Sequence, residues 1–264
     1  MTGHVKVIRP FEFTASVFDE IMRDFPYRQW LDYIESLMAL HGRSALSVLD
    51  MACGTGSLAV EMASGAYTVW GLDASEDMIG VARAKCAAAR VSVQLSVGDM
   101  RRPRAAEPPV RGRFDLVTCT FDSLNALTEE GDLDRAMRAV ADLLAPRGTF
   151  IADFNTAWGL SQRWGNRVVR GRAGDVTYEW AYSHDADRNL ASLHMKFMPS
   201  ASEEVLVEEH HERAYEPGEI AEACRGAGMS VIGLYDDRSF DAAATTSDRV
   251  FVVAGGSGRA GVSK

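Results

Sequence analysis

The chain has 264 residues, of which 47% are hydrophobic and 25% charged, and its formal net charge at pH 7 is −9. This length suits one large domain, or one domain with an inserted subdomain. The negative charge argues against a protein whose main partner is a nucleic-acid backbone, since such binding depends on Lys and Arg. No apolar run approaches the roughly 20 residues that span a bilayer. The four cysteines form no C-x-x-C pair, so we expect reduced thiols and a cytoplasmic protein.

Two amphipathic helices are expected near the N-terminus. Apolar residues recur at helical spacing on both sides of Pro26, from Phe13 to Phe25 and from Tyr27 to Met38. Pro26 suits a helix start, and Gly42 suits a helix end. We therefore predict a helical cap over residues 11–42.

Strands and helices then alternate along the chain. The expected strands cover residues 45–50, 67–73, 91–97, 114–120 and 148–154. The expected helices cover residues 56–65, 75–90, 123–127 and 130–145. This alternation predicts an α/β domain with a mostly parallel sheet that helices cover on both faces.

The pattern changes between residues 160 and 215, where long alternating strands follow one another. The clearest are Val176–Tyr182, Leu190–Met198 and Val205–Tyr215. We predict an inserted antiparallel β subdomain over residues 160–215 that serves as a lid facing the substrate. Two apolar runs close the single domain of residues 1–264, and residues 256–264 are expected to be a disordered tail.

The most informative motif is a glycine turn that follows the first of these strands. Residues 50–56 read Asp-Met-Ala-Cys-Gly-Thr-Gly, so a short apolar run ends in an acid and the turn opens a helix. Glycines let the backbone approach a ligand closely, and the first helical N–H groups point at it. Gly54, Gly56 and Ala59 also fit the Gly-x-Gly-x-x-Gly/Ala fingerprint of nicotinamide enzymes. An NAD-dependent oxidoreductase is therefore one alternative.

Three acids near the turn and the strand ends test the nicotinamide interpretation. Asp50 precedes the turn, Asp73 ends the next apolar run, and Asp99 follows the third. A nicotinamide enzyme explains Asp73 but not the other two acids, and the sequence has no Tyr-x-x-x-Lys pair. The layout resembles that of class I S-adenosylmethionine-dependent methyltransferases, and the resemblance runs from about residue 14 to residue 254. It implies a Rossmann-like sheet of seven strands, mostly parallel, whose last two strands form an antiparallel hairpin.

The resemblance also assigns the cofactor, S-adenosylmethionine, and its contacts. Asp50 would orient the turn and face the sulfonium, and Asp99 would accept the adenine amino group. Asp73 would accept both ribose hydroxyls, which are donors and therefore need an acceptor such as a carboxylate. The other expected cofactor contacts are Tyr27, Trp30, Ala52, Gly54, Gly56, Ala74, Met78, Met100, Thr120 and Phe121.

The loop after the fourth strand contains the first catalytic candidates. Ligands bind at the carboxyl ends of such strands, so Asp122, Ser123 and Asn125 are expected near the transferred methyl group. Similar Asp-Ser-Leu-Asn loops occur in a group of small bacterial methyltransferases that includes tailoring enzymes of natural products. The group also has a His-x-x-Arg-x-(Tyr/Phe) strand, which here is His210–Tyr215.

The second set of candidates lies in the predicted lid. His210 and His211 are adjacent on a strand and point to opposite faces, so they cannot bind one metal together, and we expect no metal site. One of them is expected to face the pocket as a general base. Tyr178 and Trp180 share a face with Tyr182, and form either the core of the lid or an aromatic wall for a flat or cationic acceptor.

The predicted function is methyl transfer to a small amine, an indole-like molecule or a hydroxyl by in-line displacement, in natural-product biosynthesis. The expected acceptor contacts are Asp122, Asn125, Asn155, Tyr178, Trp180 and Arg213. Residues 157–216 contain seven Lys and Arg against ten Asp and Glu, which disfavours an RNA substrate. We expect a small-molecule substrate, no nucleic acid, no membrane, and a monomer or homodimer. A tRNA-modifying methyltransferase and a non-catalytic cofactor-binding module are further alternatives.

Overall fold

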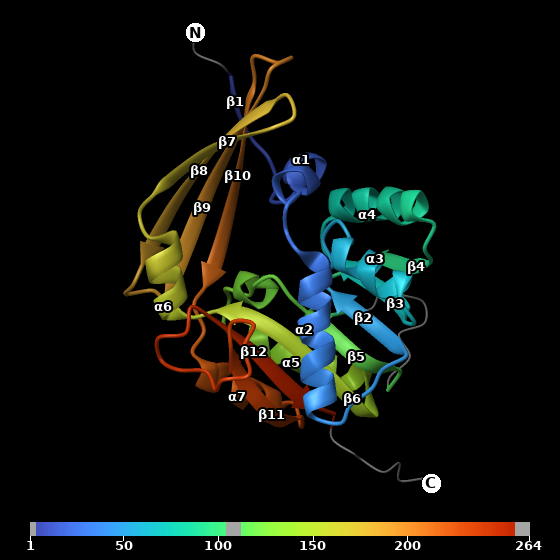
Figure 1. The fold of residues 1–264 in the computed structure, drawn as a ribbon. Coiled ribbons are helices and arrows are strands. Elements are labelled where there is room, and N and C mark those ends of the chain that lie inside the picture. The colour runs from blue at the N-terminus through green and yellow to red at the C-terminus, as the bar shows by residue number, and fades with distance from the viewer. Residues whose placement is uncertain (1–3, 104–111, 257–264) are drawn as a thin grey trace.

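The computed structural model describes residues 4–103 and 112–256. These residues form an α/β unit and a second sheet that stands beside it (Figure 1). The tail predicted at residues 256–264 lies, from residue 257 onward, outside the described residues.

The central sheet has seven strands in the spatial order β11-β12-β6-β5-β2-β3-β4. Their bounds are β2 (Ser47–Met51), β3 (Thr68–Asp73), β4 (Val93–Val97), β5 (Phe114–Cys119), β6 (Leu144–Asn155), β11 (Ser230–Asp236) and β12 (Arg249–Gly255). Strands β2 to β6 pair in parallel, and β12 is antiparallel to both β6 and β11. The predicted fold class is thus confirmed. Because β2 lies between β3 and β5, the strand order reverses there, and α/β proteins bind ligands at that point.

Helices cover both faces of this sheet. Their bounds are α1 (Thr14–Ile21), α2 (Tyr27–Leu40), α3 (Ser57–Ser64), α4 (Glu76–Ala89), η1 (Ser123–Ala126), α5 (Asp132–Leu143), α6 (Ala157–Gly159), η2 (Leu160–Trp164) and α7 (Pro217–Gly226). Of these, α1, α6 and η2 lie toward the second sheet. Leu37 of α2 and Met62 of α3 share one apolar core with Val48 of the sheet. Met137 of α5 and Ile220 of α7 lie in a second core.

The second sheet, here called the lid, has five strands in the order β1-β10-β9-β8-β7. Their bounds are β1 (Val5–Val7), β7 (Val168–Ala173), β8 (Val176–Asp185), β9 (Leu190–Pro199) and β10 (Val205–Arg213). Strand β1, which the sequence analysis did not predict, pairs in parallel with β10. All three of its residues are exposed, so it lacks the alternation that marks a half-buried strand. The lid therefore includes an N-terminal strand as well as the predicted insert.

Helix α1 is fixed to the lid by the fully buried carboxylate of Glu208 in β10. This group accepts hydrogen bonds from the backbone N–H groups of Phe11, Phe13 and Thr14, at 2.7–2.9 Å, and from Thr14 Oγ1 at 2.6 Å. The first N–H groups of a helix have no intrahelical partner, so the carboxylate caps α1. Burial alone raises the pKa of Glu208, but its hydrogen bonds, first that of His210, bring the pKa below its usual value. The capping carboxylate is thus kept ionised.

Candidate active site

The glycine turn between β2 and α3 has the backbone of a ligand cradle. Ala52, Gly54 and Gly56 have φ of 59°, 53° and 75°, in the left-handed region. A Cβ on Gly56 would lie 3.0 Å from the Cβ of Ala82 in α4, whereas a Cβ on Gly54 would meet nothing within 4 Å. Gly56 therefore allows the two helices to pack closely, and Gly54 faces open space that a ligand can use.

Asp73, at the end of β3, is oriented by two backbone amides. Its Oδ2 accepts from Gly54 N at 2.8 Å, and its Oδ1 accepts from Ser75 N at 2.9 Å. Each carboxylate oxygen keeps a further lone pair, so the group can accept two neighbouring hydroxyls. Burial raises the pKa of Asp73. A carboxylate with free lone pairs beside an open turn fits the predicted contact with the ribose hydroxyls.

Asp50 lies beneath the turn and is 2% exposed. Thr118 Oγ1 in β5 donates a hydrogen bond of 2.9 Å to Asp50 Oδ1. Burial raises the pKa of Asp50 to about 7, against the smaller opposite effect of that hydrogen bond. Its position suits a role in orienting the turn, while its contact with a sulfonium stays a prediction.

Asp99 is engaged by its neighbour. Arg101 donates from its backbone N to Asp99 Oδ1 at 2.8 Å and from Nη2 to Oδ2 at 2.5 Å. The hydrogen bonds from Arg101 hold the pKa of Asp99 below its usual value. The same guanidinium bonds Asp132 through Nη1 at 2.7 Å. The predicted contact of Asp99 with adenine stays a prediction and relies on the lone pairs that Arg101 leaves free.

An aromatic cluster joins the start of α2 to the loop after β5. The rings of Trp30 and Phe121 stack with centroids 4.9 Å apart, and Phe25 and Tyr27 contact Phe121 edge-on at 5.0 and 5.6 Å. Trp30 is 4% exposed, and its Nε1 has no hydrogen-bond partner among the described residues. Three predicted cofactor contacts are therefore brought together, although Phe121 lies more than 90 positions after Tyr27 and Trp30 in the sequence.

A cavity of about 360 Å³ lies next to the start of α3. It is lined by Asp19, Met22, Arg23, Tyr27, Ser57, Val60, Glu61 and Lys85. Lys85 Nζ donates to Asp19 at 2.6 Å, to Thr55 Oγ1 at 3.0 Å and to Ser57 Oγ at 2.5 Å. Lys85 is thus paired with Asp19, and together with the two hydroxyls it ties α1 and α4 to the turn.

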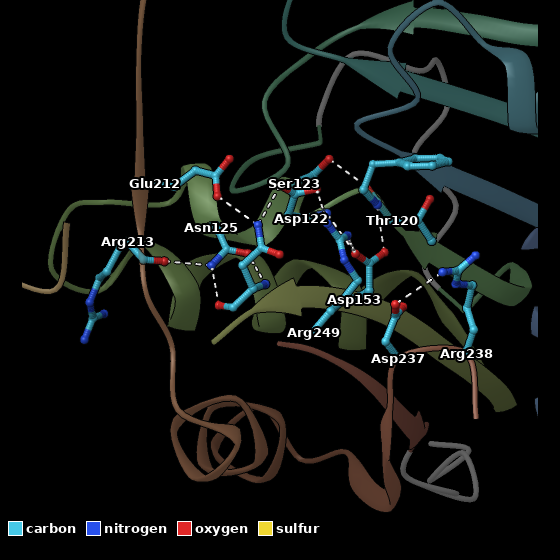
Figure 2. A network of polar contacts seen from close by, with 12 residues as sticks. Thr120, Asp122, Ser123, Asn125, Asp153, Glu212, Arg213, Asp237, Arg238 and Arg249 are labelled. Atoms are coloured by element: carbon cyan, nitrogen blue, oxygen red, sulfur yellow. Dashed lines mark hydrogen bonds and ion pairs between the residues drawn. The ribbon is translucent and has the colours of Figure 1, made fainter. Parts of the chain in front are cut away.

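The loop after β5 is held in an unusual conformation by Asp153 of β6. Phe121 and Asp122 have φ of 60° and 53°, which residues other than glycine seldom adopt. The fully buried Asp153 accepts from Phe121 N at 2.7 Å and from Asp122 N at 2.9 Å (Figure 2). One carboxylate therefore fixes the direction of the aromatic ring and of the acidic side chain.

Arg249 at the start of β12 completes this arrangement. Its Nη2 lies 3.1 Å from Asp122 Oδ1, and its Nη1 contacts Asp153 Oδ2 (Figure 2). Burial raises the pKa of Asp153 to about 6, although the charge of Arg249 opposes the shift. Burial lowers the pKa of Arg249, but the charges of both aspartates bring it above its usual value. The guanidinium stays charged and ties the two carboxylates together.

A third carboxyl group reaches this network from the lid. Asn155 Nδ2 donates to Asp122 Oδ2 at 2.8 Å and to Glu212 Oε2 at 3.1 Å (Figure 2). Burial, and then the charge of Asp122, raise the pKa of Glu212 well above its usual value. Asn155 is 3% exposed, and its Oδ1 has no hydrogen-bond partner in the described part of the chain.

The two histidines point to opposite faces of β10. His210 Nε2 lies 2.9 Å from Glu208 Oε2, and its ring meets Phe11 edge-on at 4.5 Å. His211 is exposed, with Nδ1 2.9 Å from Ser192 Oγ. His210 therefore shares the inner face of the lid with Glu212. No group of three metal-ligating side chains occurs among the residues that the structure describes.

Two residues that were predicted to contact the acceptor use their side chains for other interactions. Asn125 is fully buried and donates to the carbonyls of Asn155 and Arg213, both at 2.8 Å. The Arg213 side chain pairs with Glu219 of α7 at 2.7 Å and points away from Asp122 (Figure 2). Both residues thus tie elements together, and the structure gives neither a free group beside Asp122.

Tyr178 and Trp180 lie on the inner face of β8. Their ring centroids are 4.9 Å apart, and both pack against the apolar core that the lid shares with Val17 of α1. This packing favours the lid-core interpretation for the pair. Tyr182, further along the same face, is close enough to Glu212 and Asp122 for their charges to raise its pKa, after the larger effect of burial.

Asp153, Arg249 and Glu212 were not among the predicted site residues. Asp153 carried a usable signal, because a charged residue in the apolar run of β6 must have a buried partner. Glu212 alternates with Glu208 and His210, so a face analysis of the predicted strand would have included it.

Comparison with known proteins agrees with this architecture. Residues 48–148 match a family model described as a methyltransferase domain. YqeM of Bacillus subtilis (strain 168), named as a methyltransferase without a stated acceptor, is 28% identical over 240 residues, which are 90% of this chain and 93% of YqeM. A crystal structure of an S-adenosylmethionine-dependent methyltransferase from Clostridium acetobutylicum ATCC 824 superposes with a TM-score of 0.79 at 26% identity, covering 93% of this chain and 98% of that one.

A third relative matches over a shorter region. The dTDP-3-amino-3,6-dideoxy-alpha-D-glucopyranose N,N-dimethyltransferase of Streptomyces fradiae is 34% identical over 120 residues, 46% of this chain and 44% of that enzyme. In sequence and in fold, the chain is thus similar to class I S-adenosylmethionine-dependent methyltransferases. No helix in residues 4–103 and 112–256 has the length and apolarity to cross a membrane.

Proposed function

We propose that this enzyme methylates the nitrogen of a small amine, in a crevice between the loop after β5 and the inner face of the lid. The carboxyl groups of Asp122 and Glu212, bridged by Asn155, carry the proposal. An acidic crevice attracts a cationic acceptor and repels a carboxylate or phosphate. The amino-sugar substrate in the name of the Streptomyces fradiae relative supports the same class. We also propose that the methylated amine is a natural product or one of its precursors.

S-adenosylmethionine supplies, when bound, a methyl group on a positively charged sulfur that leaves as a neutral thioether. Asp73 accepts the ribose hydroxyls, and the open side of the turn at Gly54 receives the methionyl chain. The aromatic cluster of Tyr27, Trp30 and Phe121 excludes water from the reacting atoms. Asp122 holds the acceptor, since its backbone is fixed and its side chain is 21% exposed. The chain's part is thus mainly alignment.

The cofactor half of the proposal is tested by calorimetry with S-adenosylhomocysteine. Asp73→Asn replaces one carboxylate oxygen by a donor, so one ribose hydroxyl loses its acceptor. The affinity should fall by about 5–150-fold, equivalent to about 1–3 kcal/mol. Glu76→Gln, an exposed neighbour, should bind as the wild type does. Unchanged binding by Asp73→Asn, or binding of NAD by the wild type, contradicts the assignment.

The acceptor half is tested with S-adenosylmethionine carrying a tritiated methyl group. The panel pairs each amine, amino sugars included, with its hydroxyl counterpart, and adds indoles and bulk tRNA. Label is expected only in amines. Label in a hydroxyl or indole compound would support the corresponding alternative, and label in tRNA would point to a tRNA-modifying enzyme.

A further inference from the structure

We infer that Glu212 of β10, and neither histidine, takes the proton from the acceptor nitrogen. The inference rests on the proposed amine methylation. Glu212 of the lid reaches Asp122 by a hydrogen bond between the two carboxyl groups and through the shared amide of Asn155 (Figure 2). His210 is instead paired with the buried Glu208, and His211 lies on the outer face.

The charges around Glu212 leave room for one cation. Asp122, Asp153 and Glu212 carry up to three negative charges, and Arg249 bonds the first two. Over the described ranges of the chain, Glu212 has no cationic partner of this kind, and an ammonium ion bound beside it would supply one.

The orphaned amide oxygen of Asn155 points to the same ligand. Asn155 is 3% exposed, its Nδ2 is used by both carboxyl groups, and its Oδ1 has no partner in the described chain. A buried acceptor without a donor costs about 1–3 kcal/mol. An ammonium ion bound beside the two carboxyl groups would give this oxygen a donor while Nδ2 keeps both of its bonds.

The surroundings of Glu212 set how it titrates. Burial and the nearby charge of Asp122 raise its pKa well above the usual range, while the bond from Asn155 and the charge of Arg249 oppose the shift. From β8, Tyr182 and His184 lie on the same face of the lid as Glu212, because His184 pairs with Ala191 of β9 and Ala191 pairs with Glu212. A bound cation lowers the pKa of Glu212, because it favours the charged carboxylate. The ligand itself therefore turns Glu212 into a base.

The step then balances without another reactant. One ammonium N–H bond breaks as an O–H bond forms on Glu212, and the freed nitrogen lone pair attacks the methyl carbon. The carbon–sulfur bond breaks with its electron pair left on sulfur. The product is a methylated ammonium ion, and the proton on Glu212 passes to water. Asp122 keeps its contact with Arg249 and holds the nitrogen in line.

The titration of Glu212 tests the inference without any known acceptor. The full chain, labelled with ¹³C at its glutamate carboxyl carbons and saturated with S-adenosylhomocysteine, is titrated by NMR, and Glu212→Gln identifies the signal. The midpoint should lie well above the usual value of about 4.3. It should fall by roughly one unit or more in methylammonium chloride, compared with sodium chloride at equal ionic strength.

Variants separate this behaviour from a general effect of the lid. Asp122→Asn removes the nearby negative charge, so the midpoint of Glu212 should fall, whereas Glu209→Gln on the outer face of β10 should leave it unchanged. A midpoint near the usual value, or one that ignores methylammonium, overturns the inference.

Turnover of an amine from the panel provides the second readout. Glu212→Gln should lower kcat by ~10²–10⁴ with unchanged affinity for S-adenosylhomocysteine, and Glu209→Gln should not. Full turnover by Glu212→Gln overturns the inference while leaving amine methylation intact. If the wild type methylates no amine but Glu212 still responds to methylammonium, the proposed function fails and the cation site stands.

Discussion

At the scale of single residues, the site is distinguished by acids that are kept out of water. Asp50 and Asp153 are 2% and 0% exposed, and burial raises their pKa values to about 7 and about 6. A folded pKa above the unfolded one means that the folded state holds a proton which the unfolded state loses first. Their contribution to stability is therefore complete below pH 4 and is lost as the pH rises through the folded pKa.

Asp50→Asn should remove one of these contributions. The amide keeps an oxygen for Thr118 but cannot ionise, so the stability of the variant relative to wild type should increase between pH 4 and pH 8. The expected gain is roughly 2–4 kcal/mol in the free energy of unfolding. Urea denaturation at several pH values measures it, with the exposed Asp24→Asn as control. Parallel curves for Asp50→Asn and wild type would show that Asp50 is already ionised in the folded protein.

At the scale of elements, the loop after β5 depends on strands that follow it in sequence. Asp153 of β6 bonds both left-handed amides, and Arg249 of β12 joins that carboxylate to Asp122. Left-handed conformations in residues with side chains cost of order 1–3 kcal/mol each. Two consecutive residues in that conformation persist because the buried carboxylate accepts both of their N–H groups.

Asp153→Asn should release this loop. Its amide offers one acceptor oxygen for two N–H groups and has no charge for Arg249. We expect kcat to fall by at least about tenfold, since a positioning error of this kind is costly. Affinity for S-adenosylhomocysteine should fall less, because Phe121 is the only one of the two residues fixed by Asp153 that is expected to contact the cofactor. Asp134→Asn, exposed on α5, is the matched control. Wild-type turnover in Asp153→Asn would show that the loop holds its conformation without the carboxylate.

At the scale of the whole molecule, α1 connects the lid to the glycine turn. Glu208 of the lid caps its first turn, and Asp19 near its end accepts from Thr55 Oγ1 at 2.7 Å and from Lys85. Figure 1 shows α1 between the lid strands and α4. A ligand that orders the turn is therefore coupled to the helix that carries the lid.

Hydrogen exchange should detect this coupling. Residues 11–40 include both N-terminal helices, and their amide exchange should slow when S-adenosylhomocysteine binds, because the cap closes over the cleft. The exposed end of α5 serves as an internal reference. Equal exchange in residues 11–40 with and without the ligand would mean that Tyr27 and Trp30 only pack against the sheet.

The order of elements and the cofactor turn could be predicted because both are local in sequence. A run of apolar residues, a glycine turn and an acid at a strand end are each read within about ten residues, so the sheet class followed directly, and the family resemblance then assigned a role to Asp73. Strand β1 was missed because three exposed residues carry no such pattern.

The proposed acceptor site depends on contacts between distant segments. Asp122, Asn155, Glu212 and Arg249 span 127 positions and meet only when the lid strand β10 returns beside β6 and η1. The role of each acid is set by its burial and its neighbours' charges, which no local pattern records. The fold class could therefore be inferred from local patterns, and the cofactor from the family resemblance. Which carboxyl groups face one another could not be inferred, because their pairing depends on packing between residues far apart in the sequence.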